Sequence, residues 1–152
     1  MSDADAGQKM TNAFNDAVNA VFRECDRGKA ERRYLAALQA SKDLGDDRPY
    51  VLGWRAMILY QRGVNLLKLF GLENCAPIPE AKLADATKIR TIWFEFMEIA
   101  KRLDDPGFQD MFRRKHQFDI GQAVNSVRHD PIYRGSPIEL TDGTLVPWYD
   151  VG

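Results

Sequence analysis

The chain has 152 residues and a net charge of −1; 45% of its residues are hydrophobic and 28% are charged. This composition is that of an ordinary globular protein and argues against a disordered chain, and the length predicts one domain that buries roughly 70% of its unfolded surface. We expect a single domain over residues 1–152, with a helical body over residues 8–129 and a C-terminal arm over residues 130–152.

Apolar side chains recur every three or four residues through most of the chain, which is typical of helices that turn one face into a core. Gly28, Gly45 and Gly71 are expected to end the first three helices, because glycine readily adopts the left-handed conformation of a helix cap. The pattern predicts helices over residues 8–26, 29–44, 49–70, 80–103 and 105–128.

The segment 49–70 carries apolar residues on nearly every face, whereas the segment 80–103 carries them on one face. A helix that is apolar most of the way round is buried on several sides. We therefore predict a mainly α fold, a four- or five-helix bundle arranged around residues 49–70.

The helical repeat stops at the start of the arm. There Asp142-Gly143 separates two short apolar runs, and this pair tolerates the positive φ angles of a two-residue type I′ turn. We predict a C-terminal β-hairpin in which Leu140 pairs with Leu145. If the arm serves a partner and not the core, deleting residues 130–152 is expected to leave the helical content intact.

The sequence contains no phosphate-binding loop, nucleophile elbow or zinc-protease motif, so no metal or cofactor is predicted. The pair Glu95 and Glu98 is interpreted as solvated. His116 lies near the apolar face of its helix and is the candidate general base, acting with a nearby carboxylate or with Cys25 or Cys75. The alternative is a histidine at the core edge, hydrogen-bonded to a neighbour, and this alternative is favoured.

The basic residues concentrate in one part of the chain, since residues 27–72 carry nine basic and four acidic side chains. Residues seven apart lie on one side of a helix. Arg48, Arg55 and Arg62 are spaced by seven and are therefore expected to form a stripe, which could bind phosphates or an acidic protein surface. The alternative is a solvated face paired with nearby carboxylates. The candidate residues are Arg32, Arg33, Arg48, Arg55 and Arg62, with a further basic group at Arg113, Arg114 and Lys115.

Three aromatic residues of the arm, Tyr133, Trp148 and Tyr149, lie among prolines. Tyrosine, tryptophan and arginine are the residue types that dominate interface energetics, so these three are candidate partner-binding residues. Alternatively, Trp148 folds back over its own bundle. Exchange of the arm between copies would give a homo-oligomer.

These observations favour a small non-enzymatic protein-interaction module that docks on a larger protein. It would act as an accessory subunit, an adaptor or an inhibitor, for example an inhibitor of the phage type. One alternative is a nucleic-acid-binding regulator that uses the basic block of residues 27–68. Another is an enzyme that uses His116. The chain opens without a secretory signal and lacks an apolar run of the ~20 residues needed to span a bilayer, so a cytoplasmic location and no membrane partner are expected.

Overall fold

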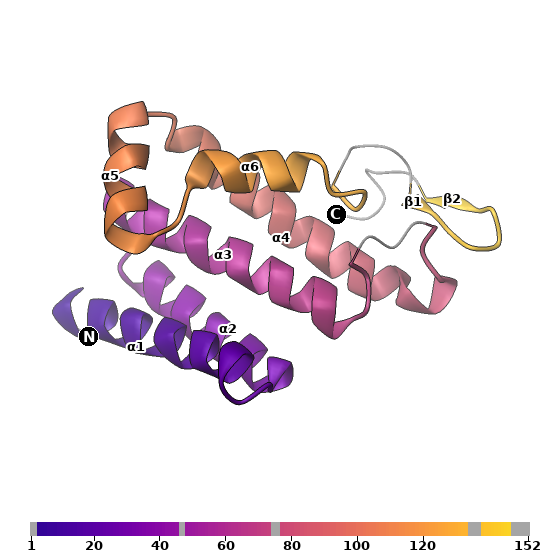
Figure 1. Ribbon diagram of the computed structural model, residues 1–152, viewed down its shortest axis with the longest axis horizontal. Coiled ribbons are helices and arrows are strands. Elements are labelled where there is room, and N and C mark those ends of the chain that lie inside the picture. The colour runs from indigo at the N-terminus through magenta and orange to yellow at the C-terminus, as the bar shows by residue number, and fades with distance from the viewer. Residues whose placement is uncertain (1–2, 46–47, 74–76, 134–137, 147–152) are drawn as a thin grey trace.

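The computed structural model describes residues 3–45, 48–73, 77–133 and 138–146 (Figure 1). Within these ranges the chain forms six α-helices, a short 3-10 helix and two strands. They are α1 (Asp3–Phe22), α2 (Arg27–Asp43), α3 (Pro49–Leu69), η1 (Glu80–Lys82), α4 (Leu83–Arg102), α5 (Pro106–His116), α6 (Ile120–Arg128), β1 (Ile138–Glu139) and β2 (Leu145–Val146). The prediction of a mainly α fold is confirmed.

The helix α3 is the centre of the fold. It contacts α2 on one side, α4 on another, and both α5 and α6. Figure 1 shows the antiparallel pair α1 and α2 below α3, with α6 above it and α5 lying across its starting end. This arrangement explains why α3 is apolar on nearly every face.

Small side chains bring α1 and α2 close together. Ala17 and Ala20 of α1, and Ala30 and Ala37 of α2, have no exposed surface. The distance between packed helices depends on the size of the side chains at the contact, so these alanines favour a close hairpin. The hairpin places the start of α1 beside the start of α3.

Two glycines of α3 likewise allow close packing, one against α5 and the other against α4. A Cβ atom on Gly53 would lie 2.7 Å from the Phe112 ring, and one on Gly63 would lie 2.4 Å from the Trp93 ring. Any larger residue would clash there with a ring of α5 or of α4. The close approach of both helices to α3 therefore requires glycine at these two positions.

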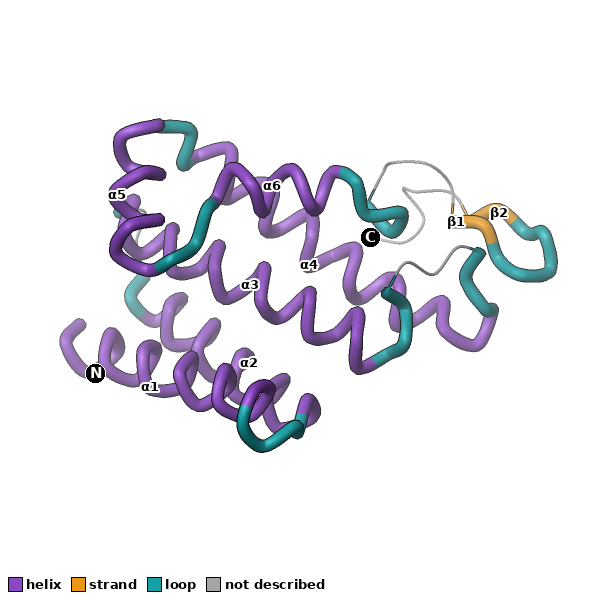
Figure 2. The backbone as a smooth tube through the Cα atoms, in the orientation of Figure 1, coloured by secondary structure: helices purple, strands orange, loops and turns teal. Residues whose placement is uncertain are grey.

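The predicted helix over residues 105–128 is wrong, because it is divided into α5 and α6. Gln117 adopts a left-handed conformation, with φ of 55°, and its N–H bonds to the carbonyl of Arg113. Asp119 then caps α6 by accepting a hydrogen bond from the Gln122 N–H at 3.0 Å. Figure 2 shows the resulting loop, which lets α5 cross α3 while α6 runs back along the bundle. A left-handed cap usually carries glycine or asparagine, so a glutamine at this position does not indicate a helix end.

The end of the first helix also differs from the prediction. The helix α1 ends at Phe22, and Cys25 has the left-handed conformation that was expected at Gly28. Asp26 caps α2, accepting from the Lys29 N–H at 2.9 Å. The loop between α1 and α2 therefore ends at Asp26, and Gly28 lies inside the first turn of α2.

The strands β1 and β2 pair antiparallel, with Glu139 opposite Leu145. The predicted pairing of Leu140 with Leu145 is wrong by one residue. The Leu140 N–H donates to the carbonyl of Thr144 at 2.8 Å, and Gly143 has φ of 90°, so the loop has three residues and includes a glycine bulge. Ile78 bonds to the backbone of Glu139 and Thr141, which ties these residues to the segment before α4.

Candidate functional site

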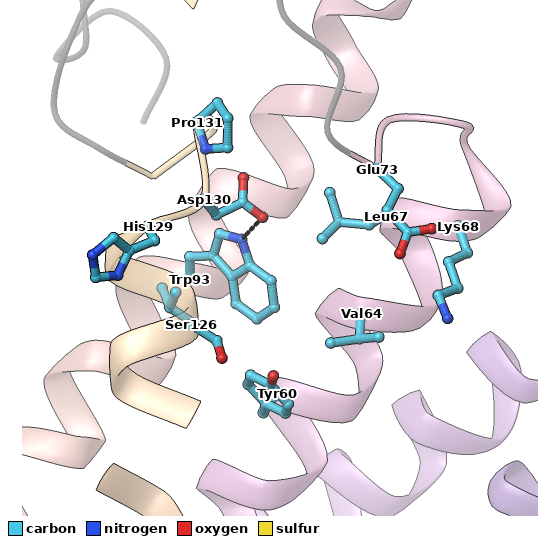
Figure 3. A pocket seen from close by; sticks show the side chains of 11 residues that line it. Tyr60, Val64, Leu67, Lys68, Glu73, Trp93, Ser126, His129, Asp130 and Pro131 are labelled. Atoms are coloured by element: carbon cyan, nitrogen blue, oxygen red, sulfur yellow. Dashed lines mark hydrogen bonds between the residues drawn. The ribbon is translucent and has the colours of Figure 1, made fainter. Parts of the chain in front are cut away.

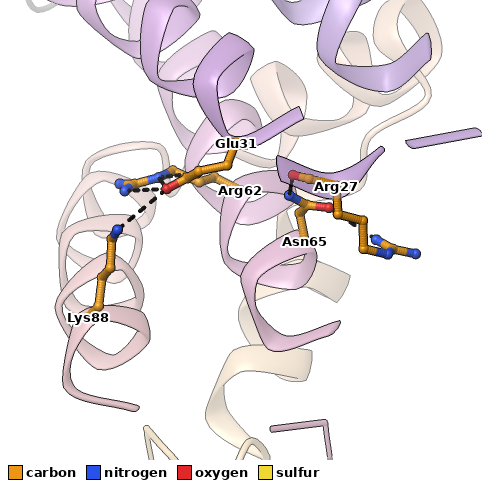
Figure 4. A network of polar contacts seen from close by, with 5 residues as sticks. All are labelled: Arg27, Glu31, Arg62, Asn65 and Lys88. Atoms are coloured by element: carbon orange, nitrogen blue, oxygen red, sulfur yellow. Dashed lines mark hydrogen bonds and ion pairs between the residues drawn. The ribbon is translucent and has the colours of Figure 1, made fainter. Parts of the chain in front are cut away.

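The arginine stripe expected on α3 faces α2. Arg62 is 8% exposed, and its Nε lies 2.9 Å from a carboxylate oxygen of Glu31 on α2 (Figure 4). Lys88 of α4 approaches the same carboxylate at 3.7 Å. Arg55 donates to the Ser41 carbonyl at 2.8 Å. The seven-residue spacing places both arginines on one side of the helix, but that side packs within the fold.

Of the other arginines in the basic block, one is hydrogen-bonded within the fold and three are exposed at the surface. Arg27 and Asn65 exchange two hydrogen bonds, of 3.1 and 3.0 Å, between α2 and α3 (Figure 4). Arg32 and Arg33 are exposed on α2, and Arg48 is exposed where α3 begins. The block is therefore not one continuous basic surface.

The beginning of the arm belongs to the core. Ile132 is 2% exposed, and its carbonyl accepts a hydrogen bond of 2.9 Å from the buried guanidinium of Arg90. Tyr133 is half-buried, with its ring centroid 5.7 Å from that of Phe94. Trp148 and Tyr149, the other two predicted partner-binding residues of the arm, lie outside the described residues.

A cavity of about 420 Å³ opens between α3, α4 and the end of α6 (Figure 3). Two of its polar side chains have partners within the fold: the Trp93 indole N–H donates to Asp130 at 3.4 Å, and His129 Nδ1 bonds a backbone carbonyl of α6 at 2.7 Å. Lys68 and Glu73 add charges of opposite sign to the lining. This mixture does not indicate a particular class of ligand.

His116, the predicted general base, lies in an aromatic cluster at the junction of α3 and α5. Its Nε2 is 3.0 Å from the Tyr50 hydroxyl oxygen. Its ring centroid lies 4.5 Å from that of the fully buried Phe112 and 5.0 Å from that of Trp54. The side chain that we find hydrogen-bonded to His116 is thus a phenol, in place of the carboxylate or thiol expected for an enzyme.

The environment of His116 favours the neutral imidazole. Burial lowers its pKa, and the positive charge of Lys115 lowers it further. In the neutral ring, Nε2 can accept the proton that the Tyr50 hydroxyl donates. The geometry and the electrostatics together make His116 a residue that orients Tyr50.

Tyr50 is 38% exposed and is held from two sides. His116 fixes its hydroxyl, and the Lys115 ammonium lies 4.9 Å from the centre of its ring. A cation at this distance from an aromatic face is attracted by the ring quadrupole. We call Arg48, Tyr50, Trp54, Lys115 and His116 the aromatic–basic face.

A groove of about 290 Å³ lies beside Tyr50, between α1 and α3. Its lining is mostly apolar. The residues around it are Gly7, Met10, Thr11, Leu44, Arg48, Tyr50, Val51 and Trp54. Tyr50 and Gly7 belong to no sequence motif, and the groove forms only when α1 and α3 meet, so neither residue could be predicted as part of a site from the sequence.

In the part of the chain that the structure describes, we find no group of three or more histidine, cysteine, aspartate or glutamate residues able to hold a metal ion. None of the described helices is both long enough and apolar enough to cross a membrane. Comparison of the chain with models of known protein families, with curated proteins and with solved structures yields no match.

Proposed function

We propose that the protein is a small interaction module that docks on a larger protein through the aromatic–basic face. The observation that carries this proposal is Tyr50, an exposed aromatic side chain fixed by His116 and Lys115. Interface hot spots are rich in tyrosine, tryptophan and arginine. Ordering a mobile side chain on binding costs about 0.5–1.5 kcal/mol, and a side chain that is already held avoids much of that cost.

The contacts of the arginines favour this function over nucleic-acid binding. Arg55 and Arg62, which are among the five arginines proposed to bind phosphate, are bonded within the fold. Arg32 and Arg33 are exposed on α2, whereas Arg48 is exposed at the start of α3. An accessory subunit, an inhibitor and an adaptor are all consistent with a docking face of this kind.

A role for the arm in binding remains a prediction for Trp148 and Tyr149. The contacts of Ile132 and Tyr133 with α4 support a structural role for the first residues of the arm. We therefore assign the docking role to the aromatic–basic face first and to the end of the arm second.

The experiment is affinity capture from the host with the tagged full-length chain, followed by binding measurements with the purified partner. We expect Tyr50→Ala to weaken partner binding by at least about tenfold, the usual effect of removing a hot-spot residue. Phe22→Ala is the matched control, because Phe22 is 77% exposed and lies at the other end of α1 from the groove.

Circular dichroism must show that both variants keep the wild-type helical content. A partner that binds Tyr50→Ala and wild type equally would contradict the proposal. If that partner is instead lost when residues 147–152 are deleted, the docking element is the end of the arm.

A further inference from the structure

The pair Asp142-Gly143 in the hairpin loop can undergo a reaction that the proposed function does not use. Of the 11 glycines in the chain, Gly143 is the one that follows an aspartate, and no glycine follows an asparagine. An aspartate before glycine can isomerise, because the glycine has no side chain to shield its nitrogen from the neighbouring carboxyl group. This pair is therefore the position where the sequence most favours spontaneous isomerisation of the backbone.

The reaction releases one water molecule and then consumes one. The Gly143 nitrogen attacks Cγ of Asp142, so that a C–N bond forms and the C–OH bond of the carboxyl group breaks. The hydroxyl leaves as water with the amide proton, and a cyclic succinimide remains. Water then opens the ring. Cleavage between the nitrogen and the main-chain carbonyl carbon of Asp142 gives isoaspartate, whereas cleavage at Cγ restores aspartate.

Burial does not protect this pair. Asp142, Gly143 and Thr144 are exposed, and a Cβ atom placed on Gly143 would have no atom beyond its chain neighbours within 4 Å. Water can therefore reach the succinimide, and nothing blocks the nitrogen sterically. Protection of the native chain has to come from hydrogen bonds within the loop.

One hydrogen bond restrains the attacking nitrogen. The Gly143 N–H donates to the Leu140 carbonyl at 2.9 Å, and the Leu140 N–H donates to the Thr144 carbonyl at 2.8 Å. Reaction needs the nitrogen about 3–3.5 Å from Cγ with its lone pair directed at that carbon. The peptide plane before Gly143 must therefore turn and release Leu140. Such local opening costs free energy, and the reaction slows in proportion to the population of the open form.

The Asp142 carboxyl group is held in its unreactive form. Its Oδ1 accepts a hydrogen bond of 2.8 Å from the Thr144 N–H. The pKa of Asp142 lies below its ordinary value, first because of a hydrogen bond with the Thr144 side chain and then because of the Thr144 N–H. A carboxylate has no hydroxyl to leave as water. Thr144 therefore lowers the fraction of chains in which Asp142 can react.

We infer that Asp142-Gly143 is a site of aspartate isomerisation, that the native loop suppresses the reaction, and that isoaspartate accumulates when the loop opens. Isoaspartate does not fit the native loop, because its main chain contains an additional carbon, the Cβ of Asp142. The hydrogen bonds between Gly143 and Leu140 and between Leu140 and Thr144 are then lost. The Thr141 N–H donates to the Ile78 carbonyl at 3.0 Å, so the modification also loosens this contact.

The test follows isoaspartate in the full-length chain, kept either native or in denaturing guanidinium chloride at the same pH and temperature. Trypsin releases residues 135–152, since Arg134 is the last basic residue of the chain. Chromatography separates the aspartate and isoaspartate peptides, which have equal masses, and electron-transfer fragmentation assigns the change to Asp142. Because the hydrogen bonds of Gly143 and Asp142 must both open, we expect a rate at least about tenfold lower in the native chain. Equal rates in the two states would overturn the inference.

Thr144→Val tests the protection of the carboxyl group. Valine keeps the shape and the backbone N–H of threonine but removes its hydroxyl. We expect isomerisation to be several-fold faster than in native wild type, and unchanged in the denatured chain. Thr141→Val is the matched control, because the Thr141 side chain is not among the groups that bond the Asp142 carboxyl group. A native Thr144→Val chain that isomerises as slowly as wild type would contradict the role of Thr144.

Asp142→Asn tests the restraint on the nitrogen by itself. An asparagine loses ammonia in the same cyclisation, so the ionisation of a carboxyl group no longer affects the rate. We expect deamidation at this position to be several-fold slower in the native chain than in the denatured chain, because the bond to Leu140 must still open. Equal rates would overturn the restraint. All of these substitutions lie at exposed positions outside the helices, and circular dichroism should show the wild-type helical content.

Discussion

The protonation state of His116 decides how Tyr50 is held. The neutral imidazole accepts the phenol proton, whereas the charged ring has no acceptor nitrogen. Burial among Trp54 and Phe112 also disfavours the charged form, and Lys115 repels it. The aromatic–basic face is therefore expected to be best ordered when His116 is neutral.

This arrangement predicts a specific dependence of stability on pH. The pKa of His116 is lower in the folded chain than the value of about 6.5 expected when unfolded. Above that value both states are neutral and the contribution of His116 is complete. As the pH falls below about 6.5, the unfolded chain binds the proton first, so the free energy of unfolding decreases until the folded pKa is reached.

Urea unfolding of wild type and His116→Gln, from about pH 7.5 to about pH 5, measures this effect. Glutamine offers Tyr50 a hydrogen-bond acceptor and does not titrate. We expect the stability difference between the two proteins to change over this range in the direction that disfavours wild type at low pH. A difference that stays constant with pH would show that His116 does not titrate in this way.

One carboxylate, whose side chain is 12% exposed, joins three helices. Glu31 of α2 pairs with Arg62 of α3 and with Lys88 of α4. Removing one member of a buried pair leaves an uncompensated charge, which costs more than the pair contributes as a whole. The contact of α2 with α3 therefore depends on both charges being present or both being absent.

We expect Arg62→Met to lower the free energy of unfolding by about 3 kcal/mol. The double variant Glu31→Leu/Arg62→Met should recover most of that loss, because neither buried charge remains. Chemical denaturation of the two single variants and the double variant gives the coupling energy. Glu98→Ala, which removes an exposed pair with Lys101, is the control and should change stability by less than about 1 kcal/mol. Additive effects of the two buried substitutions would contradict the prediction.

The start of the arm closes the core of the molecule. Asp130 accepts from the Trp93 indole, the Ile132 carbonyl accepts from Arg90, and Leu140 is 5% exposed. The sequence alone predicted that removal of the arm would leave the helical content intact. The contacts now predict the opposite.

Deleting residues 130–152 is expected to destabilise the protein by roughly 4 kcal/mol or more, since it opens the core and removes the carbonyl that receives the buried Arg90. Thermal unfolding followed by circular dichroism measures the loss. Deleting only residues 147–152 removes Trp148 and Tyr149 but keeps Asp130, Ile132 and Leu140 in the chain, and is the matched control. A stable helical protein after the longer deletion would show that the arm is dispensable for folding.

The periodicity of the apolar residues was enough to predict the helical class, the four longest helices and the central place of α3, because helix formation and burial of one face are local consequences of sequence. The break at Gln117 was missed, since its left-handed conformation occurs at a residue other than the glycine or asparagine that usually marks a helix cap. The loop of β1 and β2 was misjudged by one residue, at a place where Ile78 bonds the backbone on both sides of Leu140.

The candidate site was decided by tertiary structure. The sequence alone determined where the charged and aromatic side chains lie along each helix, including the common side of Arg55 and Arg62. Only the packing of α2 on α3 decided that this side is internal. Only the approach of α1 and α5 to the start of α3 placed Gly7, Lys115 and His116 around Tyr50. The period of a helix shows which residues share a face, but what covers that face depends on contacts between residues far apart in the chain.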